Sequence, residues 1–384
     1  MTAAGSHLRS ARLPAILLLA AAFAGLVVAN SPAADRVLAF SRVHLGAGPV
    51  DLSLSHWVSE GLLAVFFFVV SVELQFELTR GELRSARRAV QPAIAAAGGV
   101  VVPILVYLAI AVAGAGPTAG WPVPTATDIA FALGVLAVFG RGLPSSLRVF
   151  LLALAILDDI VGIVFIAVLY ASGLDLAMLA FAVIAVVLFA VVSRIDGPRA
   201  RGWVAASLVV LAIATWVLVL LSGVHATIAG VLLGLAMAQG RALGVRHALE
   251  PWVNGLILPL FAFTAALVPI PAVGSGLSPA FWGIAIALPL GKLVGIAGAG
   301  WIAQRFAAPP DQPRLALGDL LAAGALGGIG FTVSLLLADL AFADDAVVHD
   351  EAILAVLTGS SAALVLAGAL VSWRARHHRR METS

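Results

Sequence analysis

Long runs of apolar residues alternate along the whole chain with short stretches that contain charged residues, glycine or proline. Each run is close to the roughly 20 residues that a helix needs to cross a ~30 Å hydrocarbon core. The pattern predicts an all-α membrane protein with twelve transmembrane helices and no separate soluble domain. We expect these helices near residues 12–29, 57–78, 90–113, 121–139, 147–172, 176–193, 204–221, 223–239, 251–270, 279–305, 318–341 and 350–373.

Two features of this assignment have alternatives. The break at Ser222-Gly223 is short, so the seventh and eighth helices can also be one interrupted run. The first run follows Arg9 and Arg12 and precedes Ala-rich sequence, which is also typical of a signal peptide. We assign it as a helix because removing it leaves an odd number of spans.

The connection near residues 42–55 has a pattern of its own. The turn-forming sequence Gly46-Ala47-Gly48-Pro49 is followed by alternating apolar and polar residues over 50–55. Alternation after such a turn is typical of a small β-hairpin. An irregular loop fits this sequence equally well.

Composition supports the membrane assignment, and charge gives an orientation. Of the 384 residues, 62% are hydrophobic and 11% are charged, where a soluble domain carries roughly a quarter charged residues. The absence of cysteine leaves the redox compartment open. Short loops rich in Arg and Lys stay in the cytoplasm. Nineteen of the 22 basic residues fall on one side of the predicted spans: Arg9, Arg12, Arg80, Arg84, Arg87, Arg88, Arg141, Arg148, Arg194, Arg199, Arg201, Arg241, Arg246, Arg305, Arg314, Arg374, Arg376, Arg379 and Arg380.

Only Arg36 and Arg42 fall on the other side, and Lys292 belongs to no loop. We therefore expect a multi-pass inner-membrane protein with both termini in the cytoplasm. The sequence pI near 9.6 follows from the basic loops, so it does not support binding to nucleic acid.

Asp158 and Asp159 lie together near the middle of the fifth span, where an ionisable side chain costs a few kcal/mol and usually serves function. Adjacent residues on a helix point about 100° apart, so the two carboxylates can face different partners. Two close carboxylates also resist ionising together, which predicts that one of them exchanges a proton. The alternative is a polar pair that only fixes helix packing.

Lys292, the only lysine, lies near the centre of the tenth span. From that depth its side chain reaches only part of the way to an interface, so we favour a buried acidic partner over snorkelling. Asp158 and Asp159 lie at matching depth and Asp128 lies close to it, so these three are the candidate partners.

Two spans are predicted to be interrupted. In the fourth, Pro122 and Pro124 prevent a regular helix, and Thr127 and Asp128 are expected to cap the half-helix that follows. In the eleventh, four glycines crowd residues 323–332, and backbone opened at membrane depth needs protein or a cavity around it. Paired interruptions are typical of transporters. If spans 3–5 and 10–12 are inverted repeats, spans 4 and 11 cross near Asp128, although capping alone also explains this residue.

Other polar residues give weaker signals. Glu73 and Glu77 are one turn apart near the cytoplasmic end of the second span, where they line a cation-attracting mouth or merely meet solvent. Glu60, near the outer end of that span, has the same two explanations. His225 lies close to the outer surface, and a structural role is its default interpretation. Asp339, near a helix end, is expected to meet water.

The motifs resemble those of the NhaA family of bacterial sodium/proton antiporters, over essentially the whole chain and in the same order. The matching stretches are Pro124-Thr125-Ala126-Thr127-Asp128-Ile129-Ala130-Phe131-Ala132-Leu133-Gly134, Leu154-Ala155-Ile156-Leu157-Asp158-Asp159, Ser222-Gly223-Val224-His225-Ala226-Thr227, Leu258-Pro259-Leu260-Phe261-Ala262-Phe263, Gly291-Lys292 and Gly328-Ile329-Gly330-Phe331-Thr332.

The resemblance implies a core of helices 3–5 (residues 90–172) and 10–12 (279–373), and a cytoplasmic basic tail over 374–384. It implies an interface bundle over 1–89 and 173–278, and a homodimer formed partly through the external hairpin. By position, Asp159 is the main ligand of the transported cation, and Asp158 is the proton-linked partner of Lys292. Asp128 and Thr127 stabilise the unwound helix ends.

Two positions depart from the family pattern in the region linked to its pH response. The family usually has a basic pair after the glutamate of helix 2, where this chain has Gln75 and Phe76. It often has an acidic residue shortly before Pro251-Trp252, where this chain has Arg246. Both departures bear on the pH response, for which Glu73, Glu77, His225 and Glu60 are the candidate residues.

The resemblance thus implies an electrogenic antiporter that exports Na+ or Li+ for external H+ by alternating access, for sodium and pH homeostasis, with no cofactor. A carboxylate must lose its proton before it binds sodium, so the two ions compete for one site. A sodium-coupled symporter of similar fold is the alternative. A membrane-embedded enzyme is disfavoured because the Gly-x-Gly-Asp motif of aspartyl proteases and the third carboxylate of a DDxxD prenyltransferase are both missing.

Overall fold

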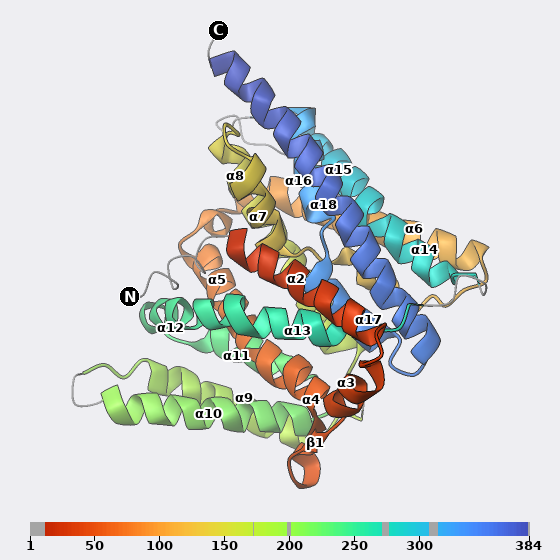
Figure 1. Ribbon diagram of the computed structural model, residues 1–384. Helices are drawn as coiled ribbons and strands as arrows, with labels where there is room; N and C mark the ends of the chain where they lie inside the picture. Colours follow the sequence, from red (N-terminus) through yellow and green to blue (C-terminus); the bar gives the residue numbers. More distant parts are fainter. Residues whose placement is uncertain (1–11, 172, 198–200, 271–275, 307–313, 383–384) are drawn as a thin grey trace.

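The computed structural model describes residues 12–171, 173–197, 201–270, 276–306 and 314–382 (Figure 1). Within these ranges, eight helices are long and apolar enough to cross a membrane, or up to ten if each of two bent helix pairs is one span. The chain is therefore an all-α membrane protein. Two shorter apolar segments, Val123–Phe139 and Thr227–Ala236, lie outside that number, so the count of twelve stays a prediction.

Three spans contain a π-helical turn that joins two α-helices into one rod: η2 within Leu54–Thr79, η5 within Gln239–Ala265 and η6 within Pro279–Phe306. The elements are α2 (Arg12–Ala29), α3 (Ala34–Ser41), β1 (His44–Leu45), η1 (Gly48–Val50), β2 (Leu52–Ser53), α4 (Leu54–His56), η2 (Trp57–Leu62), α5 (Leu63–Thr79), η3 (Glu82–Arg84), α6 (Ala86–Ala113), η4 (Val123–Thr125), α7 (Ile129–Phe139), α8 (Ser145–Leu169), α9 (Leu176–Ser193), α10 (Arg201–Leu221), α11 (Thr227–Ala236), α12 (Gln239–Trp252), η5 (Val253–Ile257), α13 (Leu258–Ala265), α14 (Pro279–Ile286), η6 (Ala287–Gly291), α15 (Lys292–Phe306), α16 (Leu317–Gly327), α17 (Phe331–Ala341) and α18 (Ala346–Glu382).

Helix ends differ from the apolar runs in two places. Helix α12 begins at Gln239, where a basic loop was expected, and α18 continues through the basic residues after 373. An apolar run shows only which part of a helix lies in the bilayer. Arg, Leu and Ala are good helix formers, so a helix can continue past that part. Several basic residues assigned to loops or to a tail therefore lie on helices, and Arg9 and Arg199 lie outside the described residues. Helices α10 and α11 are separate, because Gly223 breaks the chain between them with a φ of 79°.

Several pairs of spans pack closely along each other. Helix α15 packs along α6, and α14, α16 and α17 pack on α18, while α5 packs on α11, α9 on α10 and α2 on α13. The contact of α6 with α15 depends on Gly98 and Gly295. A Cβ added to Gly98 would lie 2.4 Å from the Gly295 carbonyl oxygen, and one on Gly295 would lie 2.2 Å from that of Gly98. Only glycine permits this approach, which places Lys292 against α6.

The connection between α3 and α4 contains a hairpin, as one of its two interpretations predicted, although each strand has only two residues. Strands β1 and β2 are antiparallel, with His44 opposite Ser53 and Leu45 opposite Leu52. The Trp57 indole donates a hydrogen bond of 2.8 Å to the Leu45 carbonyl and ties the hairpin to η2. Figure 1 shows the hairpin projecting from one end of the molecule beside α3 and α4.

Helix ends are joined by ion pairs that the sequence did not indicate. Arg374 is buried rather than part of a solvated tail, and its Nε lies 2.9 Å from Asp319 Oδ1, with His378 Nε2 3.0 Å from the same oxygen. These contacts clamp α18 to α16. Asp339, expected only to meet water, pairs with His349 at 3.0 Å.

Candidate functional site

The two interrupted segments touch at their breaks. Residues 126–128 are extended between η4 and α7, and residues 328–330 separate α16 from α17 at a bend of 49°. The backbone N–H of Asp128 donates to the Ile329 carbonyl at 2.6 Å, and the Ser334 hydroxyl donates to the Val123 carbonyl at 2.8 Å. Backbone groups freed by each break therefore find partners in the other segment, as membrane depth requires.

Asp128 caps both half-helices. Its Oδ1 accepts hydrogen bonds from the N–H groups of Ala130 and Phe131, at 3.0 and 3.2 Å, and so caps α7. Its Oδ2 accepts from the Thr332 hydroxyl at 2.7 Å and the Thr332 N–H at 3.2 Å, at the start of α17. Both helix N-termini thus face one buried carboxylate, which their dipoles stabilise.

Replacing Asp128 by alanine is expected to destabilise the protein by about 2 kcal/mol or more, since each lost cap costs about 1 kcal/mol and the Thr332 hydroxyl loses its acceptor. Asp128→Asn should cost less, because its amide oxygen still caps α7. Thermal unfolding of the purified protein in detergent measures both. Equal midpoints for the alanine variant and the unsubstituted protein would contradict the double cap.

Lys292 meets Asp158 and Thr127 in the protein interior. Its Nζ lies 2.6 Å from Asp158 Oδ2 and 3.1 Å from Thr127 Oγ1, and the side chains of Lys292 and Asp158 have no exposed surface. Thr127 Oγ1 lies 2.7 Å from both Asp158 Oδ2 and the Gly327 carbonyl oxygen, so its proton serves one of them at a time. The π-helical turn η6, which contains Pro289, ends directly before Lys292 and sets its direction on the helix. The snorkelling alternative is therefore wrong.

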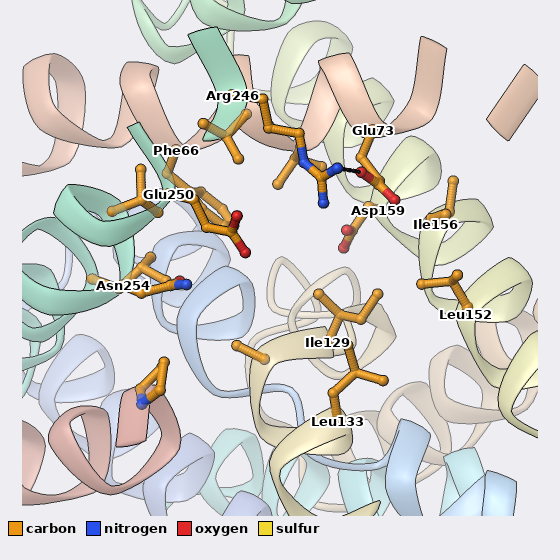
Figure 2. A pocket seen from close by; sticks show the side chains of 16 residues that line it. Phe66, Glu73, Ile129, Leu133, Leu152, Ile156, Asp159, Arg246, Glu250 and Asn254 are labelled. Carbon is orange, nitrogen blue, oxygen red and sulfur yellow. Dashed lines mark ion pairs between the residues drawn. The ribbon is translucent and has the colours of Figure 1, made fainter. Parts of the chain in front are cut away.

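Asp159 points into a cavity of about 250 Å³, which neither Asp158 nor Lys292 lines (Figure 2). Among the residues that the structure describes, none forms a hydrogen bond or an ion pair with its carboxylate. The other polar groups at the cavity are Glu73, Arg246, Glu250 and Asn254, and the remaining lining is mostly apolar. The side chains of Glu73 and Arg246 are 23% and 25% exposed, so the cavity meets solvent at that end. A carboxylate without a protein partner, reachable by water, suits an exchangeable ion.

Glu73 lies at the mouth of this cavity, as expected for a cation-attracting residue. Arg246 Nη1 lies 2.6 Å from Glu73 Oε2, which the sequence did not indicate because 173 positions separate the two residues. The chain lacks a basic residue at Phe76, and a guanidinium from α12 stands beside Glu73 instead. Glu77 is 8% exposed, which excludes a merely solvated helix end, but it does not line the cavity.

Glu60 and His225 form a pair apart from the cavity. His225 Nδ1 lies 2.7 Å from Glu60 Oε1, and the Ala226 N–H donates to Glu60 Oε2 at 2.7 Å. Glu60 is 9% exposed, so it does not simply meet solvent. The pair joins η2 to the turn before α11.

Three further polar groups of the site were not singled out from the sequence. Thr332 belongs to a family motif but gained a role only through contact with Asp128, and Glu250 and Asn254 line the cavity from helix that was assigned in part to a loop. The signal available for them was their spacing: Arg246, Glu250 and Asn254 repeat every four residues, which places them on one helix face.

Comparisons with known proteins identify the family of this chain. A family model described as Na+/H+ antiporter 1 matches residues 6–371. The Na(+)/H(+) antiporter NhaA 2 of Clavibacter michiganensis subsp. michiganensis is 59% identical to this chain, over 98% of it and 93% of its own length. The NhaA 3 antiporter of Streptomyces coelicolor is 43% identical over 97% of this chain and 81% of its own length, and the NhaA antiporter of Tropheryma whipplei is 44% identical over 94% of each. The chain therefore belongs to the NhaA family of Na+/H+ antiporters, which are transporters rather than enzymes.

Proposed function

We propose that this protein exports Na+ or Li+ in electrogenic exchange for external H+, and so maintains cell sodium and pH. The observation that carries the proposal is that the adjacent aspartates have different surroundings. Asp159 has no hydrogen-bond or ion-pair partner among the described residues and lines a cavity that meets solvent, while Asp158 is buried against Lys292. Family membership supports sodium and protons as the exchanged ions.

In this mechanism sodium and protons compete for the same carboxylates. A sodium ion that enters the cavity needs oxygen ligands, and Asp159 supplies one only after it releases its proton. Protonation of Asp158 on the other side would break its pair with Lys292, so more than one proton crosses for each sodium ion. Asp128, held by both half-helices, keeps the unwound segments in register while the site is exposed alternately to each side.

We propose the following placement in the membrane. Counting the two short apolar segments as spans gives twelve, with α6–α8 and α14–α18 as inverted repeats that cross at Asp128. The distribution of basic residues supports cytoplasmic termini, with the cavity end at Arg246 on the same side. The protein would then lie in the bacterial inner membrane as a homodimer joined partly by the β1–β2 hairpin.

The test is collapse of a pH gradient in everted membrane vesicles that contain the protein. Adding Na+ or Li+ should release protons from the vesicle lumen, while K+ should have no effect, and an imposed membrane potential should change the rate because net charge moves. Vesicles from cells without the protein are the control. Proton release by none of the three ions would refute the proposal, and a rate that ignores the potential would refute electrogenic exchange.

A further inference from the structure

Arg246 is a fixed positive charge in a cavity that the proposed mechanism uses for a cation. Its guanidinium lies 2.6 Å from the Glu73 carboxylate, and both residues line the same cavity as Asp159 (Figure 2). A sodium ion that approaches Asp159 from this end passes Glu73 and Arg246, whose side chains are 23% and 25% exposed.

The ion pair is not needed to hold its two helices together. Gln75 Nε2 donates to the carbonyl oxygens of Leu235 and Met237 at 2.6 and 2.9 Å, and Gln239 Nε2 donates to Thr79 Oγ1 at 2.5 Å. These bonds already join α5 to the corner between α11 and α12. An ion pair about a quarter exposed adds little to stability, so the position of Arg246 calls for another explanation.

Among the described residues that line it, the cavity offers three carboxylates and one cation. Asp159, Glu73 and Glu250 line it together with Arg246. Arg246 and Glu250 are four residues apart on α12 and so lie on one face of that helix. Glu250 is therefore a second carboxylate within reach of the Arg246 guanidinium. The guanidinium can turn to it when a mobile cation binds Glu73.

We propose that Arg246 is the resident counter-ion of this cavity, and that it competes with sodium for Glu73 and thereby sets the sodium concentration at which the site fills. The inference rests on the proposed function. Arg246 acts on the ion through charge and position and forms no bond to it, so it is a positioning residue. Neutralising Arg246 should lower the KM for sodium and lithium alike, since a unit charge that forms no bond to the ion acts equally on both monovalent cations.

The charge at position 246 can be varied on one protein, because the chain has no cysteine. Arg246→Cys would be treated in detergent with a methanethiosulfonate reagent that adds a neutral, a positive or a negative group, then reconstituted for sodium-driven proton transport. With the neutral group we expect the KM for sodium to fall about threefold to tenfold, the scale of one unit charge in a partly solvated cavity. The positive group should restore the original KM, and the negative group should lower it at least as far as the neutral one.

Matched variants separate charge from shape. Arg246→Lys should keep the original KM, while Arg246→Gln should behave like the neutral adduct. Arg241→Cys is the control on the same helix: Arg241 pairs with Asp196 and the Ile195 carbonyl and does not line the cavity, so its adducts should leave the KM unchanged. Raising ionic strength with a bulky cation should shrink the difference between adducts at position 246, because the Debye length is about 10 Å at 0.1 M.

The outcomes distinguish failure of this inference from failure of the proposed function on which it rests. Exchange whose KM is the same for all three adducts, or lower with the positive group than with the neutral one, overturns the role of Arg246 alone. Absence of sodium-driven exchange in the unsubstituted protein overturns the proposed function, and the inference falls with it.

Discussion

Asp159→Asn is expected to abolish sodium-driven and lithium-driven proton movement while the protein stays folded. Asparagine keeps the volume of the side chain but neither releases a proton nor offers a sodium ion a negative charge. Because no described residue bonds to the Asp159 carboxylate, the substitution breaks no protein contact. Removal of a buried negative charge that lacks a partner should leave the unfolding temperature unchanged or raise it. Gradient collapse in everted vesicles and thermal unfolding in detergent measure the two effects.

The matched control is Asp196→Asn. The Asp196 side chain is 92% exposed and lies 3.3 Å from Arg241, away from the cavity, so the same chemical change there should leave exchange intact. Sodium-driven exchange by Asp159→Asn at the rate of the unsubstituted protein would refute the assignment of Asp159 as cation ligand. Loss of exchange together with a large loss of stability would instead give Asp159 a structural role that its surroundings do not suggest.

The sequence was enough to predict that Lys292 has a buried acidic partner. A charge in the middle of an apolar run is expensive and so needs a partner at the same depth, and few acidic residues satisfy that condition. The contact with Asp158 confirms that argument. The residues alone left Asp158, Asp159 and Asp128 open as partners, because neighbouring side chains on a helix face different ways and only the helix arrangement decides which one meets Lys292.

The interrupted spans were equally visible, because proline and clustered glycine act locally on the backbone. The sequence placed capping at Thr127 and Asp128, and Asp128 does cap α7, but its second cap on α17 joins residues 204 positions apart. Contacts of this kind depend on which helices are neighbours. The pairs of Glu60 with His225 and of Asp319 with Arg374 were missed for the same reason.

The charged mouth of the cavity shows a different limit. Arg246 and Glu250 fell in a stretch assigned to a loop, since hydropathy detects only the part of a helix that lies in lipid. Helix α12 extends past that part and carries both side chains on one face. Polar extensions of membrane helices are therefore places where hydropathy hides functional positions, and four-residue spacing of charges is the better guide to them.

Removal of either partner of the Lys292–Asp158 pair should destabilise the protein by about 3–5 kcal/mol, because the other charge is left buried without compensation. Both side chains have no exposed surface, so water cannot solvate the remaining charge. Lys292→Met leaves Asp158 with only the Thr127 hydroxyl, and Asp158→Asn leaves the ammonium with neutral partners. Thermal unfolding of the purified variants in detergent measures the loss.

The double variant Lys292→Met/Asp158→Asn should regain most of that stability, since it buries no charge and keeps similar volumes. The pair of Arg241 with Asp196, whose side chain is 92% exposed, is the control cycle, in which the single and double neutral variants should lower the unfolding temperature much less than those at the buried pair. If the double variant at the buried pair were as unstable as the sum of its two single variants, the charges would not be compensating each other. The pair would then stabilise the fold through packing. The ion pair between Asp158 and Lys292, which the transport mechanism requires to break on protonation, would have no physical basis.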